Sequence, residues 1–354
     1  MALTISPRPV PRIVLSRELG INAAREARKL GYVAVARGAF VEPLTAAKPW
    51  EQTEHLALAG IAAATLRLSP KAVISHASAA LLHGLWVLDP ETRTHVTHPT
   101  RVHRPPDALH RHCLTLPDDD VTEVDGRRVT TVARTIVDCA KSMHPREALP
   151  IADSGMRLLL APSPRNRTVD LAAMQHLRTR LLELVEMGPH HGRRQAREII
   201  RCAHPLAEAP YESVVRWVAI SHGLPLPTLQ QRFDIDRKVF FVDLCWHLQL
   251  IRDGQCVGLV VLLVEYDGDI KYRAGDGLDP LANAQHAVDT VMAEKRREDL
   301  LRTVRHATII RLDRHDVRDA DALFRKLCAS LPARTVAQLR PVPALLGPLP
   351  KRRG

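Results

Sequence analysis

The sequence Leu262-Leu263-Val264-Glu265-Tyr266-Asp267-Gly268-Asp269-Ile270-Lys271-Tyr272 continues an apolar run that begins at Leu259 and adds two acids and a glycine. Alternate residues of a strand share a face and lie about 6.6 Å apart, so Glu265 and Asp267 can converge on one cation. Two carboxylates about 5 Å apart repel by roughly 3 kcal/mol at an effective dielectric near 20. The pattern therefore predicts a buried strand whose end binds a metal ion or faces a lysine such as Lys271.

Length and composition place the chain among ordinary globular proteins. Its 354 residues predict two or three domains, and 45% hydrophobic with 25% charged residues is typical of soluble folds. No segment approaches the ~20 apolar residues that span a bilayer, and the first residues lack the apolar core of a secretory signal. The six cysteines form no CxxC pair. We therefore expect a cytoplasmic protein with reduced thiols and no membrane partner.

The positive charge is concentrated at the two ends of the chain. Residues 1–50 hold 8 Lys/Arg and 3 Asp/Glu, and residues 331–354 hold 5 Lys/Arg and no acid. Residues 201–330 are close to neutral, with 18 basic and 19 acidic residues. A phosphate-binding surface is therefore expected at the ends, with DNA as the partner.

Residues 13–42 predict a short helix-turn-helix with a wing, inside a module that we place at 10–48. Asn22 is a suitable N-cap for a second helix that ends before Gly31, and the turn at Arg37-Gly38 predicts a β-hairpin. The first helix usual in winged modules is missing. A helix of this kind can enter a major groove while the wing contacts a phosphate; the alternative is a solvated face of a small packing domain. The expected DNA-binding residues here are Arg25, Arg28, Lys29 and Arg37.

Residues 50–160 predict a mixed α/β middle domain, followed by connecting helices at 161–205. Its histidines do not pair at i, i+4 beside a glutamate, and zinc sites need three or four ligands at defined spacing. We therefore interpret them as surface or structural residues: His95, His98, His103, His110 and His112. The expected strands are 94–97, 109–115 and 121–130, the last split by a turn at Asp125-Gly126, and the expected helices are 50–67, 77–82, 133–141 and 146–160.

Residues 206–332 predict a separate domain with the order α-β-β-β-α-β-α. A helix at 211–222 carries Glu212, a strand at 238–246 carries Asp243, and the Glu265 strand follows. The remaining elements are a strand at 228–235, a long helix at 281–304, a strand at 307–312 and a helix at 320–331. A basic, proline-rich tail occupies 333–354, and we expect it to be disordered from Arg340 onward. The fold class is thus α/β, in a multidomain α+β arrangement.

Two groups of motifs resemble known families. The middle group is SHASAALLHG at 75–84 with DGRRVTTVARTIVD at 125–138. It resembles the AbiEi antitoxins of type IV toxin–antitoxin systems, which also have a winged-helix N-terminus. The C-terminal group resembles the very-short-patch-repair-like, PD-(D/E)XK restriction-endonuclease-like domain of a large actinobacterial family. That second group consists of Glu212, Asp243, Glu265-Tyr266-Asp267-Gly268, Lys271-Tyr272 and Glu294-Lys295-x-Arg297-Glu298.

The nuclease-like resemblance implies roles for individual residues. Asp243 and Glu265 match the two metal-binding acids, with Asp267 as a third ligand, and Glu212 matches the helix acid that completes many such sites. The usual lysine, two residues after the second acid, is replaced by Asp267, so Lys271 would supply that charge. Lys295 or Arg297 would contact the scissile phosphate. The resemblance implies Mg²⁺ as the cofactor, which suits oxygen ligands and activates water.

Two functions follow as hypotheses. The first is a DNA-binding transcriptional regulator of the AbiEi antitoxin type, with a cognate toxin as a partner and a nuclease-like C-terminal domain. The second is a metal-dependent DNA endonuclease in which Mg²⁺ bound by Asp243 and Glu265 serves phosphodiester cleavage. Under a non-catalytic interpretation, Glu265 and Asp267 pair with cations such as Lys271, Arg273 and Lys295. A third option, an interaction scaffold without a nucleic-acid role, is disfavoured by the charged ends.

Overall fold

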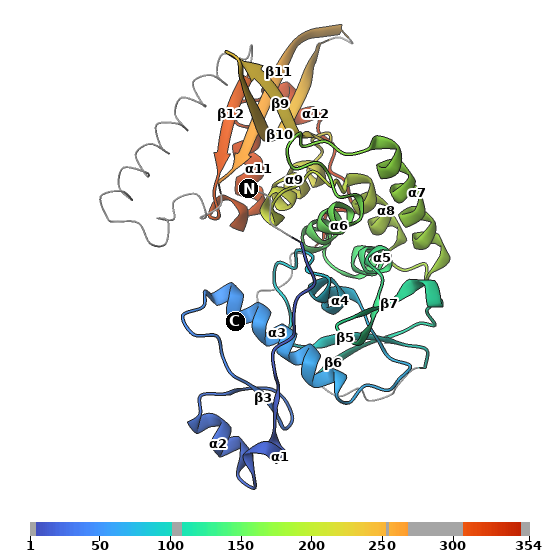
Figure 1. Cartoon of the computed structure of the whole chain (residues 1–354). Coiled ribbons are helices and arrows are strands. Elements are labelled where there is room, and N and C mark those ends of the chain that lie inside the picture. The colour runs from blue at the N-terminus through green and yellow to red at the C-terminus, as the bar shows by residue number, and fades with distance from the viewer. Residues whose placement is uncertain (1–4, 101–107, 253–254, 268–306, 348–354) are drawn as a thin grey trace, which may run out of the picture. The chain divides into compact units, whose positions relative to one another are not determined.

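The computed structural model describes residues 5–100, 108–252, 255–267 and 307–347 (Figure 1). The chain divides into two compact units, one built from 2–161 with 170–205 and the other from 162–169 with 206–354. Helices and strands mix in both units, and the described residues form three sheets. The predicted multidomain α+β fold class is therefore confirmed. Among the described residues, no helix is both long and apolar enough to cross a membrane.

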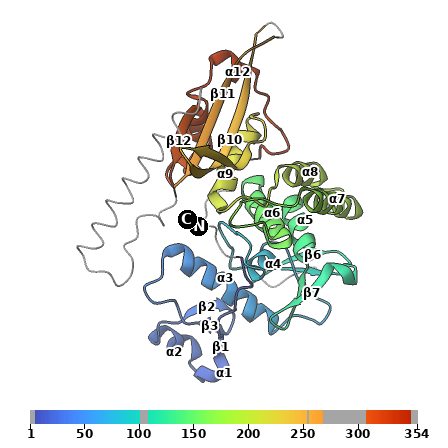
Figure 2. The ribbon, with the colours of Figure 1, turned by 45° about the horizontal axis from the view of Figure 1, so that its top comes forward.

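The first unit begins with a small helical pair and a three-stranded sheet, seen together in Figure 2. Helix α2 follows Asn22 as predicted, although the side chain of Asn22 makes no capping hydrogen bond. The hairpin turns at Arg37-Gly38, where Gly38 has a φ of +70° that favours glycine. The elements are β1 (Val14–Leu15), α1 (Ser16–Leu19), α2 (Ala23–Lys29), β2 (Val33–Ala36) and β3 (Ala39–Val41), in the strand order β1-β3-β2.

A five-stranded mixed sheet follows in the same unit, in the order β6-β5-β4-β8-β7. Strands β7 and β8 are neighbours in the sequence and in the sheet, because the predicted turn at Asp125-Gly126 joins them. An apolar cluster around Leu58, Ile74 and Leu82 joins the helices to the strands. The elements are α3 (Pro49–Thr65), β4 (Val73–Ile74), α4 (His76–Leu82), β5 (Thr94–His98), β6 (Leu109–Cys113), β7 (Val121–Val124), β8 (Arg127–Thr130), α5 (Val132–Ser142) and α6 (Pro145–Leu160).

The helices α7 (Leu171–Met187) and α8 (Arg193–Cys202) pack against α5 and α6 of this unit. The ammonium group of Lys141 donates to the backbone carbonyls of Val185 and Pro189 at 2.8 and 3.1 Å. The Gln195 amide donates to two further carbonyls, at the end of α5. These bonds satisfy carbonyls that a helix terminus leaves without partners, so α7 and α8 extend the core of the first unit.

The second unit is a four-stranded sheet in the order β12-β11-β10-β9, with β9, β10 and β11 antiparallel and β12 parallel to β11. The predicted order of elements is confirmed, except that the helix expected at 281–304 lies outside the described residues. Strand β10 runs beyond Trp246, where the sequence predicted its end. The elements are α9 (Pro210–Ser221), β9 (Thr228–Ile235), β10 (Lys238–Arg252), β11 (Gln255–Tyr266), β12 (Ala307–Leu312), α11 (Ala320–Cys328) and α12 (Ala333–Gln338).

The segment after α12 is ordered through residue 347, so the prediction of disorder from Arg340 onward is wrong for residues 340–347. The indole N–H of Trp217 on α9 donates to the carbonyl of Leu345 at 3.0 Å, and the Leu345 side chain is buried. The backbone N–H of Val342 donates to the carbonyl of Ser221 at 2.9 Å. Proline content and charge suggested disorder, but buried Leu345 and the paired indole hold this segment in place.

Candidate functional site

Four acids of the second unit were expected at one site, and we call Glu212, Asp243, Glu265 and Asp267 the acid row. Leu244 pairs with Val264, so Asp243 and Glu265 are the next opposed positions of β10 and β11. Glu265 is in turn the register partner of Arg311 on β12. Opposed residues of neighbouring strands project from the same face of a sheet. The register therefore places Asp243 and Glu265 on the same face of neighbouring strands, while their convergence on one cation stays a prediction.

Two hydrogen bonds orient the carboxylate of Asp243. Its Oδ2 accepts the backbone N–H of Tyr266 at 3.0 Å, and its Oδ1 accepts the side-chain amide of Gln230 at 3.3 Å. The first bond joins Asp243 to the strand end that carries Glu265. The second joins it to β9, so Gln230 extends the polar row to a third strand. Hydrogen bonds to both oxygens hold this carboxylate in one direction.

Helix α9 brings Glu212 to Asp243 as the third acid. Glu212 is 5% exposed, and its Oε2 accepts the backbone N–H of Glu208 at 2.8 Å. Burial, followed by the nearby charge of Asp243, raises the pKa of Glu212 well above its ordinary value, while the charge of Arg216 acts in the opposite direction. Ionising a buried carboxyl group beside a second carboxylate is unfavourable without a compensating cation. Glu212 therefore keeps its proton at a higher pH than an exposed glutamate.

Arg311 is a cation of this site that the sequence reasoning missed. Its Nη2 lies 3.8 Å from Oε2 of Glu265, and its Nη1 lies 3.6 Å from Oδ2 of Asp267. The non-catalytic interpretation had named Lys271, Arg273 and Lys295 as the pairing cations. Those three residues and Arg297 lie outside the described residues. The signal for Arg311 was a basic residue in the otherwise uncharged strand Ala307 to Leu312.

The acid row offers carboxylate oxygens, which are the ligand type of a hard cation. Glu265 is 3% exposed and Asp243 is oriented by two donors, but no three acids among the described residues lie close enough together to hold a metal ion as they stand. Mg²⁺ prefers such carboxylate oxygens and retains several waters. The guanidinium of Arg311 competes for the charge of Glu265, since it already neutralises part of it. The row therefore supports either cation binding or a structural ion-pair cluster.

Four of the predicted DNA-binding residues belong to the N-terminal module, and the other two, Lys295 and Arg297, lie outside the described residues. Arg25, Arg28 and Lys29 are exposed on α2, and Arg37 is exposed at the hairpin turn. Lys29 is held by Glu26, with Nζ 2.8 Å from Oε1. Exposed pairs of this kind contribute less than about 1 kcal/mol, so Lys29 can leave Glu26 for a phosphate.

A hollow beside the hairpin adds two arginines that the sequence reasoning did not select. Its charged residues are Arg17 of α1, Arg37 of the turn and Arg67 beyond α3. The Arg67 guanidinium donates to the backbone carbonyl of Arg37 at 2.6 Å, which fixes its position near the turn. Three guanidinium groups around one hollow form a surface suited to a phosphate group. The full lining is Leu15, Ser16, Arg17, Arg37, Gly38 and Arg67.

Comparison with known proteins identifies one part of the chain. Residues 72–187 match the AbiEi antitoxin C-terminal domain family. Two uncharacterized proteins of Mycobacterium tuberculosis, from two strains, are each 29% identical over 182 residues, which is 49% of this chain and 58% of each relative. The aligned region thus spans little more than half the length of those relatives. No solved structure matches the chain. The matched range 72–187 contains the sheet β4–β8 and the helices α4 to α7.

Proposed function

We propose that this chain is a DNA-binding regulator of the AbiEi antitoxin type. Its N-terminal module contacts DNA, and a cognate toxin is the partner of its middle domain. The observation that carries the proposal is the AbiEi match at residues 72–187, placed directly after a module with an exposed basic helix. The toxin–antitoxin relation comes from that match, and the DNA contact comes from the basic residues upstream of it.

In this proposal the basic helix α2 contacts the bases of DNA and the hairpin contacts its phosphate backbone. Arg25 and Arg28, on the exposed side of α2, would enter the major groove, and Arg37 would contact the backbone. Arg17 and Arg67 would add phosphate contacts at the hollow next to the turn. Contacts of this second kind position a protein on DNA without reading its sequence.

Binding to the DNA upstream of the chain's own gene tests the proposal. Fluorescence anisotropy over a range of salt concentrations should show a steep decrease in affinity with salt, because each phosphate contact contributes about 0.9 to the slope. Arg25→Ala with Arg28→Ala should weaken binding at least tenfold. Arg17→Ala with Arg67→Ala should lower the salt slope by about two and leave sequence preference unchanged.

A matched control removes two positive charges elsewhere. Arg180 and Arg194 are exposed on α7 and α8, and replacing both by alanine changes the net charge by the same amount. This control should bind within about twofold of the unmodified chain, since its charges lie outside the proposed DNA contact. If the control weakens binding as much as the α2 variant does, the contact is not on the N-terminal module and the proposal fails.

A second candidate function is metal-dependent DNA cleavage. What supports it is that Glu212 and Glu265 are buried and that Asp243, on the strand between them, is near enough to Glu212 to raise its pKa. In this proposal Asp243 and Glu265, with Asp267, would hold Mg²⁺, which lowers the pKa of a bound water. Lys271 would hold the attacking water or the developing charge, and Lys295 or Arg297 would contact the scissile phosphate; these three residues lie outside the described residues.

Cleavage of supercoiled plasmid in Mg²⁺ or Mn²⁺ tests the second candidate. Asp243→Asn and Glu265→Gln keep the shape of the side chains and remove the charge, so each should abolish nicking. Asp234→Asn serves as the control, because Asp234 is an exposed acid of β9 in the same sheet, paired with Arg232. Nicking that persists in Asp243→Asn and Glu265→Gln comes from a contaminant, and absence of nicking in the unmodified chain excludes the candidate.

A further inference from the structure

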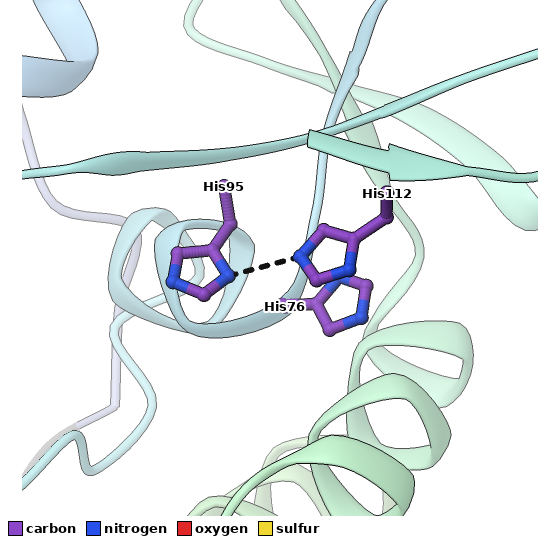
Figure 3. Close-up of side chains that lie close together, drawn as sticks. All are labelled: His76, His95 and His112. Carbon is purple, nitrogen blue, oxygen red and sulfur yellow. Dashed lines mark hydrogen bonds between the residues drawn. The ribbon is translucent and has the colours of Figure 1, made fainter. Parts of the chain in front are cut away.

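Three histidines of the first unit, distant in the sequence, lie together beside the middle sheet (Figure 3). One ring nitrogen from each of His76, His95 and His112 lies within 4.8 Å of the corresponding nitrogens of the other two. Nδ1 of His95 is 3.1 Å from Nε2 of His112, so one of these nitrogens donates to the other. Only two of these residues were among the histidines that the sequence singled out, and none was interpreted as a ligand.

The topology of the sheet explains the convergence. Strands β5 and β6 are parallel, and their register pairs His95 with His110 and Thr97 with His112. The side chains of His95 and His112 therefore share a face of the sheet. His76 reaches the same place because α4 begins directly after β4, the other neighbour of β5. The three histidines therefore come from three separate elements and meet without the i, i+4 spacing of a helical metal site.

The local environment keeps these rings neutral, which is the form that binds metals. Burial, with the charge of His112 as the next cause, lowers the pKa of His95 to about 3. Burial and the charge of His110 lower the pKa of His112 to about 4. The pKa of His76 is also lowered well below its ordinary value, chiefly by burial. At neutral pH all three imidazoles therefore have a lone pair available.

His76 is held by its surroundings in the way that metal-binding histidines usually are. Its Nδ1 lies 2.9 Å from Oγ of Ser75, which in turn accepts the hydroxyl of Thr97 at 2.8 Å. A polar partner on one ring nitrogen orients the other nitrogen toward a metal. His76 also has a φ of +53°, a conformation that costs energy for a residue with a side chain. The surrounding contacts therefore hold the backbone of His76 in a strained conformation, together with its ring.

We propose that His76, His95 and His112 form a binding site for a late first-row transition-metal ion, with Zn²⁺ as the expected occupant. Three neutral imidazoles suit Zn²⁺, Cu²⁺ or Ni²⁺ and disfavour Mg²⁺ and Ca²⁺, which prefer oxygen ligands. Zn–N bonds of about 2.0–2.1 Å in tetrahedral geometry place ligand nitrogens about 3.3 Å apart. The His95–His112 nitrogens already lie at 3.1 Å. Three protein ligands leave a fourth position for water or another ligand.

One rearrangement accompanies binding. The rings of His76 and His112 are stacked, with centroids 3.5 Å apart and planes inclined by 11°. Their lone pairs therefore lie in nearly parallel planes, and one imidazole must turn about its Cβ–Cγ bond before both face the same ion. The proton between His95 and His112 also moves to the other nitrogen of the ring that donates it, so that both facing nitrogens have a lone pair. Metal binding thus replaces a ring stack and one hydrogen bond by three coordinate bonds.

Titration of the untagged, full-length chain with Zn²⁺ tests the proposal, after treatment with chelator and its removal. Calorimetry should give one high-affinity site, and Co²⁺ should give the visible absorption of a tetrahedral complex. His95→Gln and His112→Gln should each weaken Zn²⁺ binding at least tenfold. The controls are His98→Gln, on β5 but three residues beyond His95 and bonded to Ser69, and His83→Gln, bonded to Thr130. Both should bind within about twofold of the unmodified chain.

A measurement on the unmodified chain keeps the test independent of how the variants fold. Side-chain ¹⁵N spectra of the histidines should show that Zn²⁺ shifts the ring nitrogens of His76, His95 and His112 and leaves those of His83 unchanged. Absence of these shifts, Zn²⁺ binding weaker than about 100 μM, or equal affinity in His98→Gln and His112→Gln would overturn the proposal. Loss of the site in His95→Gln and His112→Gln alone supports it.

Discussion

Arg311 and Glu265 are register partners on the parallel strands β12 and β11, and Nη2 of the arginine lies 3.8 Å from Oε2 of the glutamate. The glutamate is almost fully buried, while the arginine side chain is 28% exposed. The same guanidinium approaches Asp267 at 3.6 Å. Among the described residues, Arg311 therefore contributes positive charge at the strand end that the sequence analysis selected as a candidate site.

Replacing Arg311 by glutamine should destabilise the second unit by about 1–3 kcal/mol, because Glu265 loses a charge partner while it stays buried. Urea denaturation in the presence of chelator measures the effect. Arg232→Gln is the control, since its pair with Asp234 is exposed on both sides, and it should cost less than about 1 kcal/mol. Added Mg²⁺ should restore more stability to Arg311→Gln than to the unmodified chain. No such restoration would count against a metal at the acid row.

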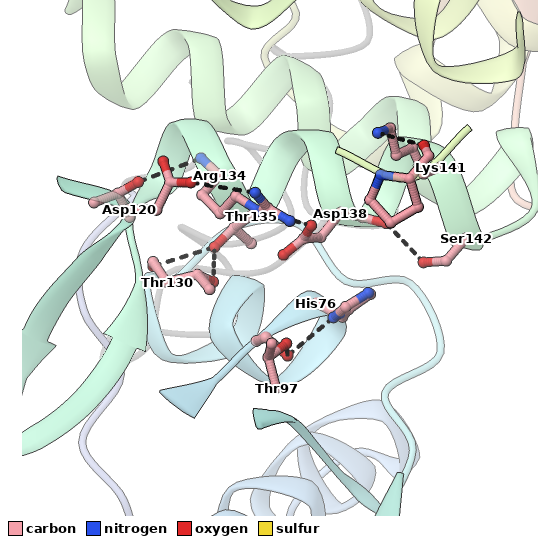
Figure 4. A network of polar contacts seen from close by, with 12 residues as sticks. His76, Thr97, Asp120, Thr130, Arg134, Thr135, Asp138, Lys141 and Ser142 are labelled. Atoms are coloured by element: carbon pink, nitrogen blue, oxygen red, sulfur yellow. Dashed lines mark hydrogen bonds and ion pairs between the residues drawn. The ribbon is translucent and has the colours of Figure 1, made fainter. Parts of the chain in front are cut away.

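Arg134 joins two acids in the interior of the first unit (Figure 4). Its Nε donates to Oδ1 of Asp138 at 2.9 Å and its Nη1 to Oδ2 of Asp120 at 3.2 Å. Burial raises the pKa of Asp138 despite the charge of Arg134, and Oδ2 of Asp138 has no hydrogen-bond partner among the described residues. Asp138 therefore depends on Arg134 for its charged form.

Arg134→Met should destabilise the first unit by about 3–5 kcal/mol, because it leaves two buried carboxyl groups without a cation. Arg134→Met combined with Asp138→Leu should be less destabilising than Arg134→Met alone, since one of the two orphaned acids is removed. Chemical denaturation followed by circular dichroism compares the variants. Arg127→Gln, at a hairpin pair whose Asp125 side chain is 59% exposed, is expected to cost less than Arg134→Met, since it leaves no buried carboxyl group without a cation. A double variant less stable than the single one would contradict this account.

The first unit should lose stability as the pH falls below about 6.5, the ordinary pKa of histidine. The buried ring of His83 donates Nε2–H to the carbonyl of Thr130 at 2.8 Å, and burial lowers its pKa. Above about pH 6.5 both folded and unfolded states hold a neutral His83. Below about pH 6.5 the unfolded state binds a proton that the folded state does not bind. The free energy of unfolding therefore falls by up to about 1.4 kcal/mol per pH unit for each such group.

His83→Gln can still donate to Thr130 and no longer titrates, so the variant should lose less stability than the unmodified chain between pH 6.5 and 4.5. His76, His95 and His112 have lowered pKa values as well and contribute to the slope that remains, whereas the raised pKa values of Asp138 and Glu147 oppose it. Free energies of unfolding at several pH values, all in chelator, measure both slopes. Identical slopes would mean that His83 is protonated equally in both states.

Gly84 and Gly126 have similar backbone φ angles, but the space around their Cα atoms differs. Their φ values are +76° and +70°, but a Cβ at Gly84 would lie 1.9 Å from the carbonyl oxygen of Ser6, whereas one at Gly126 meets nothing within 4 Å. The segment around Ser6 cannot easily retreat, because the N–H of Arg8 donates to Leu82 at 3.0 Å. Gly126→Ala should cost about 1–2 kcal/mol from backbone strain alone. Gly84→Ala should cost at least about 1–3 kcal/mol more, from the clash, and thermal unfolding of the two variants tests the difference.

Local chemistry was enough to predict most elements of this protein. The turns at Arg37-Gly38 and Asp125-Gly126, and the apolar run before Glu265, are set by neighbours within a few positions. These features predicted the hairpins, the order of elements along the second unit and the strand that ends at Glu265.

Contacts between distant segments were decided only by the tertiary structure. Arg311 meets Glu265 because β12 joins β11 in parallel register, and Leu345 is ordered because Trp217 needs an acceptor for its indole N–H. The grouping of His76 with two histidines of β5 and β6 depends on the order of strands in the sheet. Strand order and packing partners arise from burial over the whole chain, and no local pattern in this sequence specifies them.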